Sequence, residues 1–398
     1  MEKKQAIWIG SALGLGVMMV ATPPLFQALM KKGLEKRIEK LKKFGFELNL
    51  TKDQSNYFKT DKVYHFVVNR NGKEWEGDVE ISYLNLPVTS VDFNWTISRY
   101  TPSPDELWFT IPLRKAFWEG QKGEASSRDL KHFTYQIYPI QKKELNTTQL
   151  EGEINVETDR KYSFTLNGDK LSFQEGDTQG VVTNFTNKIS VDGQYGKYNS
   201  TANIMIKSPE FQFYIGKFAH QTSTYIKEKV GSGESRISFS TLQANFPTGK
   251  SILNDGEIDI KTQNFPLKLI KEINNNLNIE QLFKILASYH TQHNITLKIG
   301  NTTIGDKSLG DVSFKLGGSC NSLQYQLIPC NITLDYFGSV DFTTNVITPM
   351  LSGFPVLQRM IPFLFKKDGT HYKLSITLDG VTGKLRVNDY VFPVPKFF

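Results

Sequence analysis

The chain has 398 residues and a formal net charge of +7, and 22% of its residues are charged and 12% aromatic. A chain so rich in aromatic residues is not intrinsically disordered, and its length suffices for one large or two ordinary domains. The excess of 47 Lys and Arg over 40 Asp and Glu lies largely near the N-terminus, beside an apolar segment. This distribution argues against a nucleic-acid-binding protein.

An uncharged segment, residues 7–30, follows a short basic N-terminus. A bilayer core of about 30 Å needs about 20 apolar residues, so the segment is long enough to cross a membrane once. A cleavable signal peptide is the alternative, but its apolar region spans only about 7–15 residues. We therefore predict an uncleaved signal-anchor, and we assign residues 1–45 to the transmembrane helix and a basic juxtamembrane helix.

The residues after the predicted anchor combine a helical period with positive charge. Leu34, Ile38, Leu41 and Phe44 are three or four positions apart, which predicts a helix with one apolar stripe. This stripe would pack on the body, because two heptads are too few to support a coiled-coil stalk. The basic side chains would contact anionic lipid headgroups, at about 1 kcal/mol each. This membrane-surface cluster consists of Lys31, Lys32, Lys36, Arg37, Lys40, Lys42 and Lys43.

Beyond this helix the apolar period changes from helix to strand. Residues 63–69 alternate between two faces, and Asn71-Gly72 supplies the residue types that a tight hairpin turn needs. Residues 74–84 and 88–100 continue the alternation. We expect these strands to form an antiparallel meander.

The following part of the chain repeats the hairpin pattern. Residues 122–131 are polar and predict a loop, whereas the aromatic residues before them are expected to pack in a core or at a sheet edge. Residues 162–166 and 171–173 flank Asn-Gly-Asp, which predicts a strand, a turn and a strand. Because no fixed repeat period is visible, we predict one hairpin-rich β body over residues 46–262.

The C-terminal part, residues 263–398, contains the remaining helical patterns and ends in strands. Residues 266–290 carry apolar stripes interrupted by three asparagines, which predicts two helices. Residues 350–365 are nearly all apolar but contain glycine and prolines, so we expect a buried or interfacial helix there. Residues 372–378 alternate before an Asp-Gly turn, which predicts a closing β-hairpin. The expected fold is mostly β with minor α: a large antiparallel sheet body behind one membrane helix.

Two cysteines, Cys320 and Cys330, are separated by nine residues. A disulfide closing so short a loop would contribute about 2.5 to 3 kcal/mol. In a reducing compartment the same residues would be two small buried apolar side chains. A metal site is a weaker alternative, because the region supplies no second cysteine pair or convergent histidines.

The sequence contains conflicting signals for the side of the membrane on which the body lies. Lysines and arginines after the span favour a cytoplasmic body. The cysteine pair and the secretion-like start favour an oxidising space outside the cytoplasm. Three Asn-x-Thr sequons also carry an acidic residue two positions earlier, and these resemble the extended acceptor sequon of bacterial oligosaccharyltransferases. We predict a periplasmic body with candidate N-glycan acceptors Asn49, Asn94 and Asn146.

No combination of residues has the spacing of a catalytic or metal site. His290 and His293 are the only neighbouring histidines, and they lie at a predicted helix end without the Glu-x-x-His context of a zinc site. The segment around Gly249-Lys250-Ser251 lacks the first glycine of a phosphate-binding loop. We therefore predict no catalysis, no cofactor and no metal.

Several pieces of the chain resemble the YdgA-like family of bacterial envelope proteins. They are the membrane segment with its charged helix, the strand at residues 55–68, and the terminal Asp379-Gly380 and Gly383-x-Leu-x-Val-Asn388. The resemblance implies an inner-membrane-anchored periplasmic protein and brings no catalytic residues. It covers most of the chain in architecture.

These patterns lead to two hypotheses for function. The first is a single-pass inner-membrane protein whose periplasmic body is a binding or structural module for another envelope component. The alternative is a carrier of lipid or another hydrophobic ligand, in which the strands curl into a groove that residues 350–365 close or line. In both hypotheses the partners are the membrane and an envelope protein or lipid, and not nucleic acid.

Overall fold

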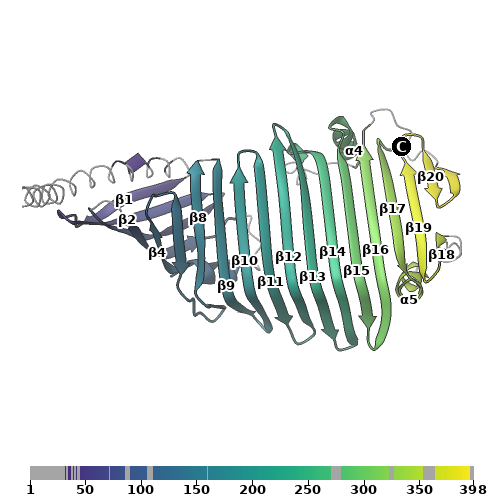
Figure 1. Cartoon of the computed structure of the whole chain (residues 1–398), viewed down its shortest axis with the longest axis horizontal. Coiled ribbons are helices and arrows are strands. Elements are labelled where there is room, and N and C mark those ends of the chain that lie inside the picture. Colours follow the sequence, from purple (N-terminus) through teal and green to yellow (C-terminus); the bar gives the residue numbers. More distant parts are fainter. Residues whose placement is uncertain are drawn as a thin grey trace, which may run out of the picture. The chain divides into compact units, whose positions relative to one another are not determined.

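The computed structural model describes residues 32, 35, 36, 39 and 42, and residues 45–394 except 71, 86–89, 105–110, 159, 270–278, 322–326 and 353–363. The chain separates into two compact units, unit 1 (Met1–Glu175) and unit 2 (Gly176–Phe398). Both consist mainly of antiparallel strands (Figure 1). The predicted fold class, mostly β with minor α, is therefore confirmed. The boundary between the units lies inside the body predicted for residues 46–262.

Unit 1 is a meander of short and medium strands. Its strands are β1 (Phe46–Asp53), β2 (Lys59–Arg70), β3 (Lys73–Leu84), β4 (Val91–Thr101), β5 (Lys122–Ser127), β6 (His132–Ile137), β7 (Leu145–Thr147), β8 (Leu150–Thr158) and β9 (Lys161–Glu175). Each strand from β1 to β5 pairs antiparallel with the next, β6 pairs with β8, and β8 pairs with β9. The short strand β7 pairs with a further part of β9.

One face of unit 1 is apolar and packs against the helix α2 (Ile111–Trp118). A buried cluster forms around Val91, which is fully buried. Ala116 of α2 joins a second cluster with Ile140, and the rings of Trp118 and Trp75 lie 5.8 Å apart. Of the aromatic residues expected to pack in a core or at a sheet edge, Phe117 packs against the buried cluster of Ala116 and Trp118 is half-buried, while those in 105–110 lie outside the described residues. Side chains alternate along each strand, so the opposite face carries the polar residues.

Two local predictions for unit 1 are wrong. Residues 122–127 form strand β5 and not a loop, because β4 and β6 pair with them on both sides. Gly123 lies close beneath the ring of Trp95, where a Cβ atom would be 2.3 Å from a ring carbon. The predicted turn around Gly168 is absent, because β9 continues through it and Gly168 pairs with Leu150 of β8. Ladder pairing on both sides outweighs the turn preference of Asn-Gly-Asp.

Unit 2 is a longer meander. Its strands are β10 (Thr178–Asp192), β11 (Tyr195–Lys207), β12 (Gln212–Lys227), β13 (Val230–Phe246), β14 (Gly249–Pro266), β15 (Gln292–Ile304), β16 (Lys307–Cys320), β17 (Cys330–Ser339), β18 (Lys366–Asp368), β19 (His371–Asp379), β20 (Lys384–Val387) and β21 (Tyr390–Pro393). Neighbours pair antiparallel in chain order from β10 to β17, and β17 pairs with β19. Strands β18 and β20 share the outer edge of β19, and β20 pairs with β21. The predicted closing hairpin is confirmed.

Residues with positive φ angles interrupt the long strands of unit 2 along one line that crosses the sheet. Asn184, Lys217, Asp255 and Gly310, on alternate strands, adopt positive φ angles of 50°, 49°, 52° and 80°. The register shifts beside three of these positions, as expected for β-bulges. On β12 the backbone N–H of Lys217 donates to Oδ1 of Asn203, at 2.8 Å. Bulges bend a strand and increase its twist. We call this line of four positions the crease.

Short helices cover parts of the apolar face of unit 2. The helix α4 (Ile279–Ser288) lies inside the predicted helical stretch 266–290, whose residues 270–278 are outside the described part. A second helical run begins with α5 (Val340–Phe342) and continues through a π-helical turn, η2 (Thr343–Ile347), into α6 (Thr348–Ser352). This run starts before the predicted residue 350, because Ser339 caps it by accepting a hydrogen bond from the N–H of Phe342.

The predicted anchor, residues 7–30, lies outside the described residues. Among the residues that are described, no helix has both the length and the apolar character needed to cross a membrane. Of the predicted basic cluster, Lys32, Lys36 and Lys42 are helical and exposed. The other four members, Lys31, Arg37, Lys40 and Lys43, lie outside the described residues.

Candidate binding surfaces

A hollow of about 700 Å³ lies on the polar face of unit 1. Its floor is a row of directly paired residues on five strands, and directly paired residues share one face of a sheet. This row consists of Asn94, Glu124, Gln136, Glu151 and Asn167. A parallel row adds Asp92, Ser126, Thr134 and Glu153. The hollow therefore presents carboxylates, amides and hydroxyls side by side.

Hydrogen bonds hold the centre of this hollow in place. The hydroxyl of Tyr138 donates to Glu124 at 2.7 Å, and the amide of Gln136 donates to the same carboxylate. These two bonds, that of Tyr138 first, lower the pKa of Glu124. The carbonyl of Gln136 in turn accepts from the amide of Gln149. The hollow is thus a preformed, anionic, hydrogen-bonding surface.

The hollow has no metal-binding arrangement. Within the described parts of the chain, no three His, Cys, Asp or Glu side chains are grouped as metal ligands would be. Beneath it, the buried hydroxyl of Tyr135 donates to the carbonyl of Thr165, and burial raises the pKa of Tyr135. Tyr135 therefore stays protonated and serves as a structural donor.

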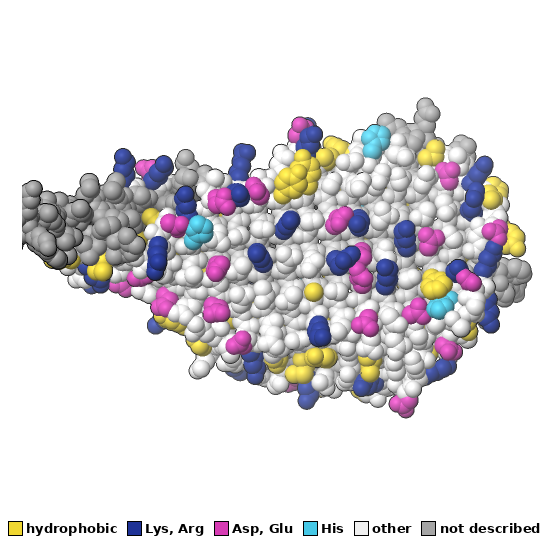
Figure 2. All heavy atoms as spheres, viewed as in Figure 1, with side chains coloured by type: hydrophobic (Ala, Val, Ile, Leu, Met, Phe, Trp, Pro, Cys, Tyr) yellow, Lys and Arg dark blue, Asp and Glu magenta, His cyan; other side chains and the backbone are white. Residues whose placement is uncertain are grey.

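On the charged face of unit 2, basic and acidic side chains form ion pairs with one another. Figure 2 shows Lys and Arg side chains interspersed with Asp and Glu across its strands. Arg236 contacts Asp259 at 2.7 Å and Glu257 at 3.0 Å, and Lys261 contacts Glu234 at 3.1 Å. The hydrogen bond to Arg236 lowers the pKa of Asp259, and the same pair raises the pKa of Arg236. These charges keep the face solvated, and a small hollow of about 280 Å³ lies among them.

The opposite face of unit 2 is apolar on its later strands. A row of directly paired residues runs through Ile260, Ile295, Leu316, Leu334 and Ile376. Ile295 is 38% exposed and Leu316 is 42% exposed, while the other members are half-buried. We call these five residues the apolar row.

Towards the earlier strands the same row becomes polar. Ser235 is paired with Ile260, and Thr222 with Ser235. The Nε2 atom of His220 lies 3.0 Å from the hydroxyl of Ser235 and 2.9 Å from that of Thr222. A serine–histidine pair alone is not a catalytic triad, and within the described residues no carboxylate contacts His220 to orient it.

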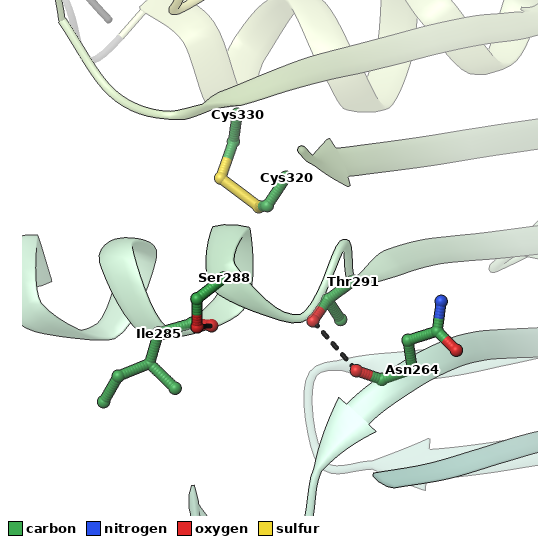
Figure 3. The surroundings of a disulfide bond; sticks show 6 residues. All are labelled: Asn264, Ile285, Ser288, Thr291, Cys320 and Cys330. Carbon is green, nitrogen blue, oxygen red and sulfur yellow. Dashed lines mark hydrogen bonds between the residues drawn. A yellow bond between two sulfur atoms is a disulfide. The ribbon is translucent and has the colours of Figure 1, made fainter. Parts of the chain in front are cut away.

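The two cysteines form a disulfide that joins directly paired residues at the ends of β16 and β17 (Figure 3). Cys320 is 4% exposed and Cys330 is 1% exposed, and both pack against α4. The backbone N–H of Cys320 donates to the carbonyl of Thr291, whose hydroxyl donates to the carbonyl of Asn264 at 3.1 Å. Of the alternatives left open by the sequence, the disulfide is therefore the one observed.

The three candidate glycan acceptors are exposed and lie on strands of unit 1. Asn49 is on β1, Asn94 on β4 and Asn146 on β7. Asn94 is also part of the hollow, which sequence reasoning did not identify. Their glycosylation stays a prediction.

The chain matches no family model, no curated protein and no solved structure. The resemblance to the YdgA-like family stays a prediction.

Proposed function

We propose that the chain is a non-enzymatic protein of the bacterial envelope, anchored in the inner membrane by residues 7–30, with a periplasmic body that binds another envelope component. The observation that carries the proposal is the preformed hollow of unit 1. Its carboxylates and amides come from five strands whose register is fixed by backbone pairing. A surface held so rigidly needs little ordering when it binds a partner.

The disulfide supports a location outside the cytoplasm. Disulfides persist in oxidising compartments and are rare in the cytosol. The three acidic sequons agree with the same location. A phosphatase reporter fused after residue 50 tests it, because the reporter is active only in the periplasm; activity restricted to a cytoplasmic reporter at that position would refute the location.

Site-specific crosslinking tests the binding proposal. A photo-crosslinking amino acid in place of Asn94 lies in the hollow, whereas one in place of Asn294 lies on an exposed strand position of unit 2. Both positions are exposed asparagines within a strand, so they form a matched pair. We expect a specific crosslinked product from position 94 in intact cells and none from position 294. Identical patterns from the two positions would contradict the proposal.

A second function, carriage of a lipid or another hydrophobic ligand, is favoured by the apolar row of unit 2. The exposed side chains of Ile295 and Leu316 belong to a row that lies perpendicular to the strands. Native mass spectrometry of the detergent-free protein would detect a co-purified lipid. Leu316→Gln should reduce that lipid severalfold, whereas Leu50→Gln, at a somewhat more exposed leucine in unit 1, should not.

A further inference from the structure

An exposed aromatic tip projects from the connection between β1 and β2. Phe58 is 60% exposed and Tyr57 is 42% exposed, and their rings meet edge to face with centroids 5.0 Å apart. Leu84, at the end of β3, is 46% exposed and lies beside them, since its strand partner is Lys59. We call Tyr57, Phe58 and Leu84 the aromatic tip.

A fully buried asparagine holds the backbone of this tip. Asn85 is 0% exposed, and its amide donates to the carbonyls of Asn56 at 2.9 Å and Tyr57 at 3.1 Å. Its backbone N–H donates to the carbonyl of Phe58 at 2.7 Å. The backbone carbonyls of residues 56–58 therefore all accept hydrogen bonds from Asn85.

The backbone donors of the tip are held in the same way. The Oδ1 atom of Asn56 accepts from the N–H groups of Phe58, at 2.9 Å, and Lys59, at 2.8 Å. The N–H of Asn56 donates to the carbonyl of Lys59 at 2.7 Å. Loops at a protein surface normally leave such groups to water. A loop that satisfies most of them internally loses few hydrogen bonds when it leaves water, as segments that enter a bilayer must.

We infer that the aromatic tip inserts into the headgroup region of a lipid bilayer and docks unit 1 on the membrane. The inference rests on the proposed anchoring. Tyrosine is enriched at that depth, and phenylalanine is typical of the apolar side of helices that bind there. Lys59, which pairs with Asp61 at 2.9 Å, lies beside them. At about 200 Å² per aromatic side chain, the exposed part of the two rings is about 200 Å². This is far below the roughly 800 Å² per partner of a stable protein interface.

The chain geometry allows this docking. β1 begins at Phe46, shortly after the predicted juxtamembrane helix, and ends at Asp53, just before the tip. Its eight residues span about 26 Å at 3.3 Å per residue. A strand lying along the membrane surface from the anchor would therefore carry the tip to the same surface.

Thiol labelling of the full-length protein in liposomes tests the inference. Both native cysteines are in the disulfide, so Phe58→Cys introduces a single reactive thiol for an environment-sensitive NBD dye. Tyr195→Cys is the matched control, because Tyr195 is also 60% exposed and lies at a hairpin end of unit 2. We expect the dye at position 58 to shift to shorter wavelength. Doxyl-labelled lipids should quench it severalfold more strongly than the dye at position 195, in phosphatidylcholine vesicles with or without phosphatidylglycerol.

The outcomes separate the inference from the proposed anchoring. Protein that floats with vesicles while its position-58 dye behaves like the control would overturn the docking and leave the anchoring intact. Protein that does not float with vesicles at all would overturn both. A blue shift that appears only after addition of envelope protein, and is insensitive to doxyl lipids, would assign the tip to a protein partner and overturn membrane docking.

Discussion

Replacing Asn85 with alanine tests whether the buried asparagine supports the fold of unit 1. The change removes two hydrogen bonds to loop carbonyls and the bond that Asn85 Oδ1 accepts from the hydroxyl of Thr60, at 3.0 Å. Thr60 is 1% exposed, so this last bond is shielded from water. At about 1 kcal/mol for each bond, and more where a buried group loses its bond, we expect unfolding to become easier by about 2–4 kcal/mol.

Tryptophan fluorescence during urea unfolding of the detergent-solubilised full-length protein measures this effect, because all five tryptophans belong to unit 1. Asn49→Ala, at an exposed position of unit 1, is the control and should change stability by less than about 0.5 kcal/mol. Thr60→Val combined with Asn85→Ala should cost less than the sum of the two changes, because the residues share a bond. A decrease in the free energy of unfolding of less than about 1 kcal/mol in Asn85→Ala, or full additivity of the two changes, would refute the stabilising role of Asn85.

Three further predictions concern unit 2. Cys320→Ser should lower its stability by about 2–3 kcal/mol, as estimated for a loop of ten residues, and circular dichroism during heating would detect the loss. A hydrogen bond from the hydroxyl of Thr382 lowers the pKa of Asp379, so this carboxylate contributes stability above its unfolded pKa of about 3.9 that is lost as the pH falls through its folded value. In Asp379→Asn the melting temperature should therefore decrease less steeply below pH 5. An unchanged decrease would contradict the stabilising role of the Asp379 carboxylate. Gly256→Ala should destabilise by about 1–3 kcal/mol, because its Cβ would lie 1.9 Å from a packed aromatic ring, whereas Gly318→Ala meets nothing within 4 Å and should be tolerated in the same melting assay.

Strands were predictable where alternation was strong. Residues 63–69 and 372–378 show two clear faces, and both lie in observed strands, β2 and β19. Where the pattern was weak, tertiary pairing decided: the polar residues 122–127 became a strand because β4 and β6 flank them. Local propensity is a weak guide when ladder partners are available on both sides.

The crease and the hollow could not be predicted, for a different reason. A positive φ at Asn184 or Asp255 agrees with the tolerance of those residue types for left-handed backbone, but Lys217 has no such preference. The crease needs these positions to lie in register on alternate strands, and register is absent from local sequence. The hollow likewise joins Asn94 on β4 to Asn167 on β9, which only the pairing of five strands reveals. The cysteine pair was identified, but its oxidation state was left open because spacing alone permits both states.

The binding free energy that the apolar row can contribute decides which of the two proposed functions is preferred. Burying a whole leucine or isoleucine side chain gains about 1.5–3 kcal/mol, so Ile295 and Leu316, which are exposed by 38% and 42%, offer about 2 kcal/mol together. A dissociation constant of 1 mM already needs 4.1 kcal/mol. A lipid held by these two side chains alone would bind too weakly to be carried, and a carrier would have to uncover the half-buried members of the row as well. The hollow of unit 1 needs no such rearrangement, and for that reason the binding module is the leading proposal.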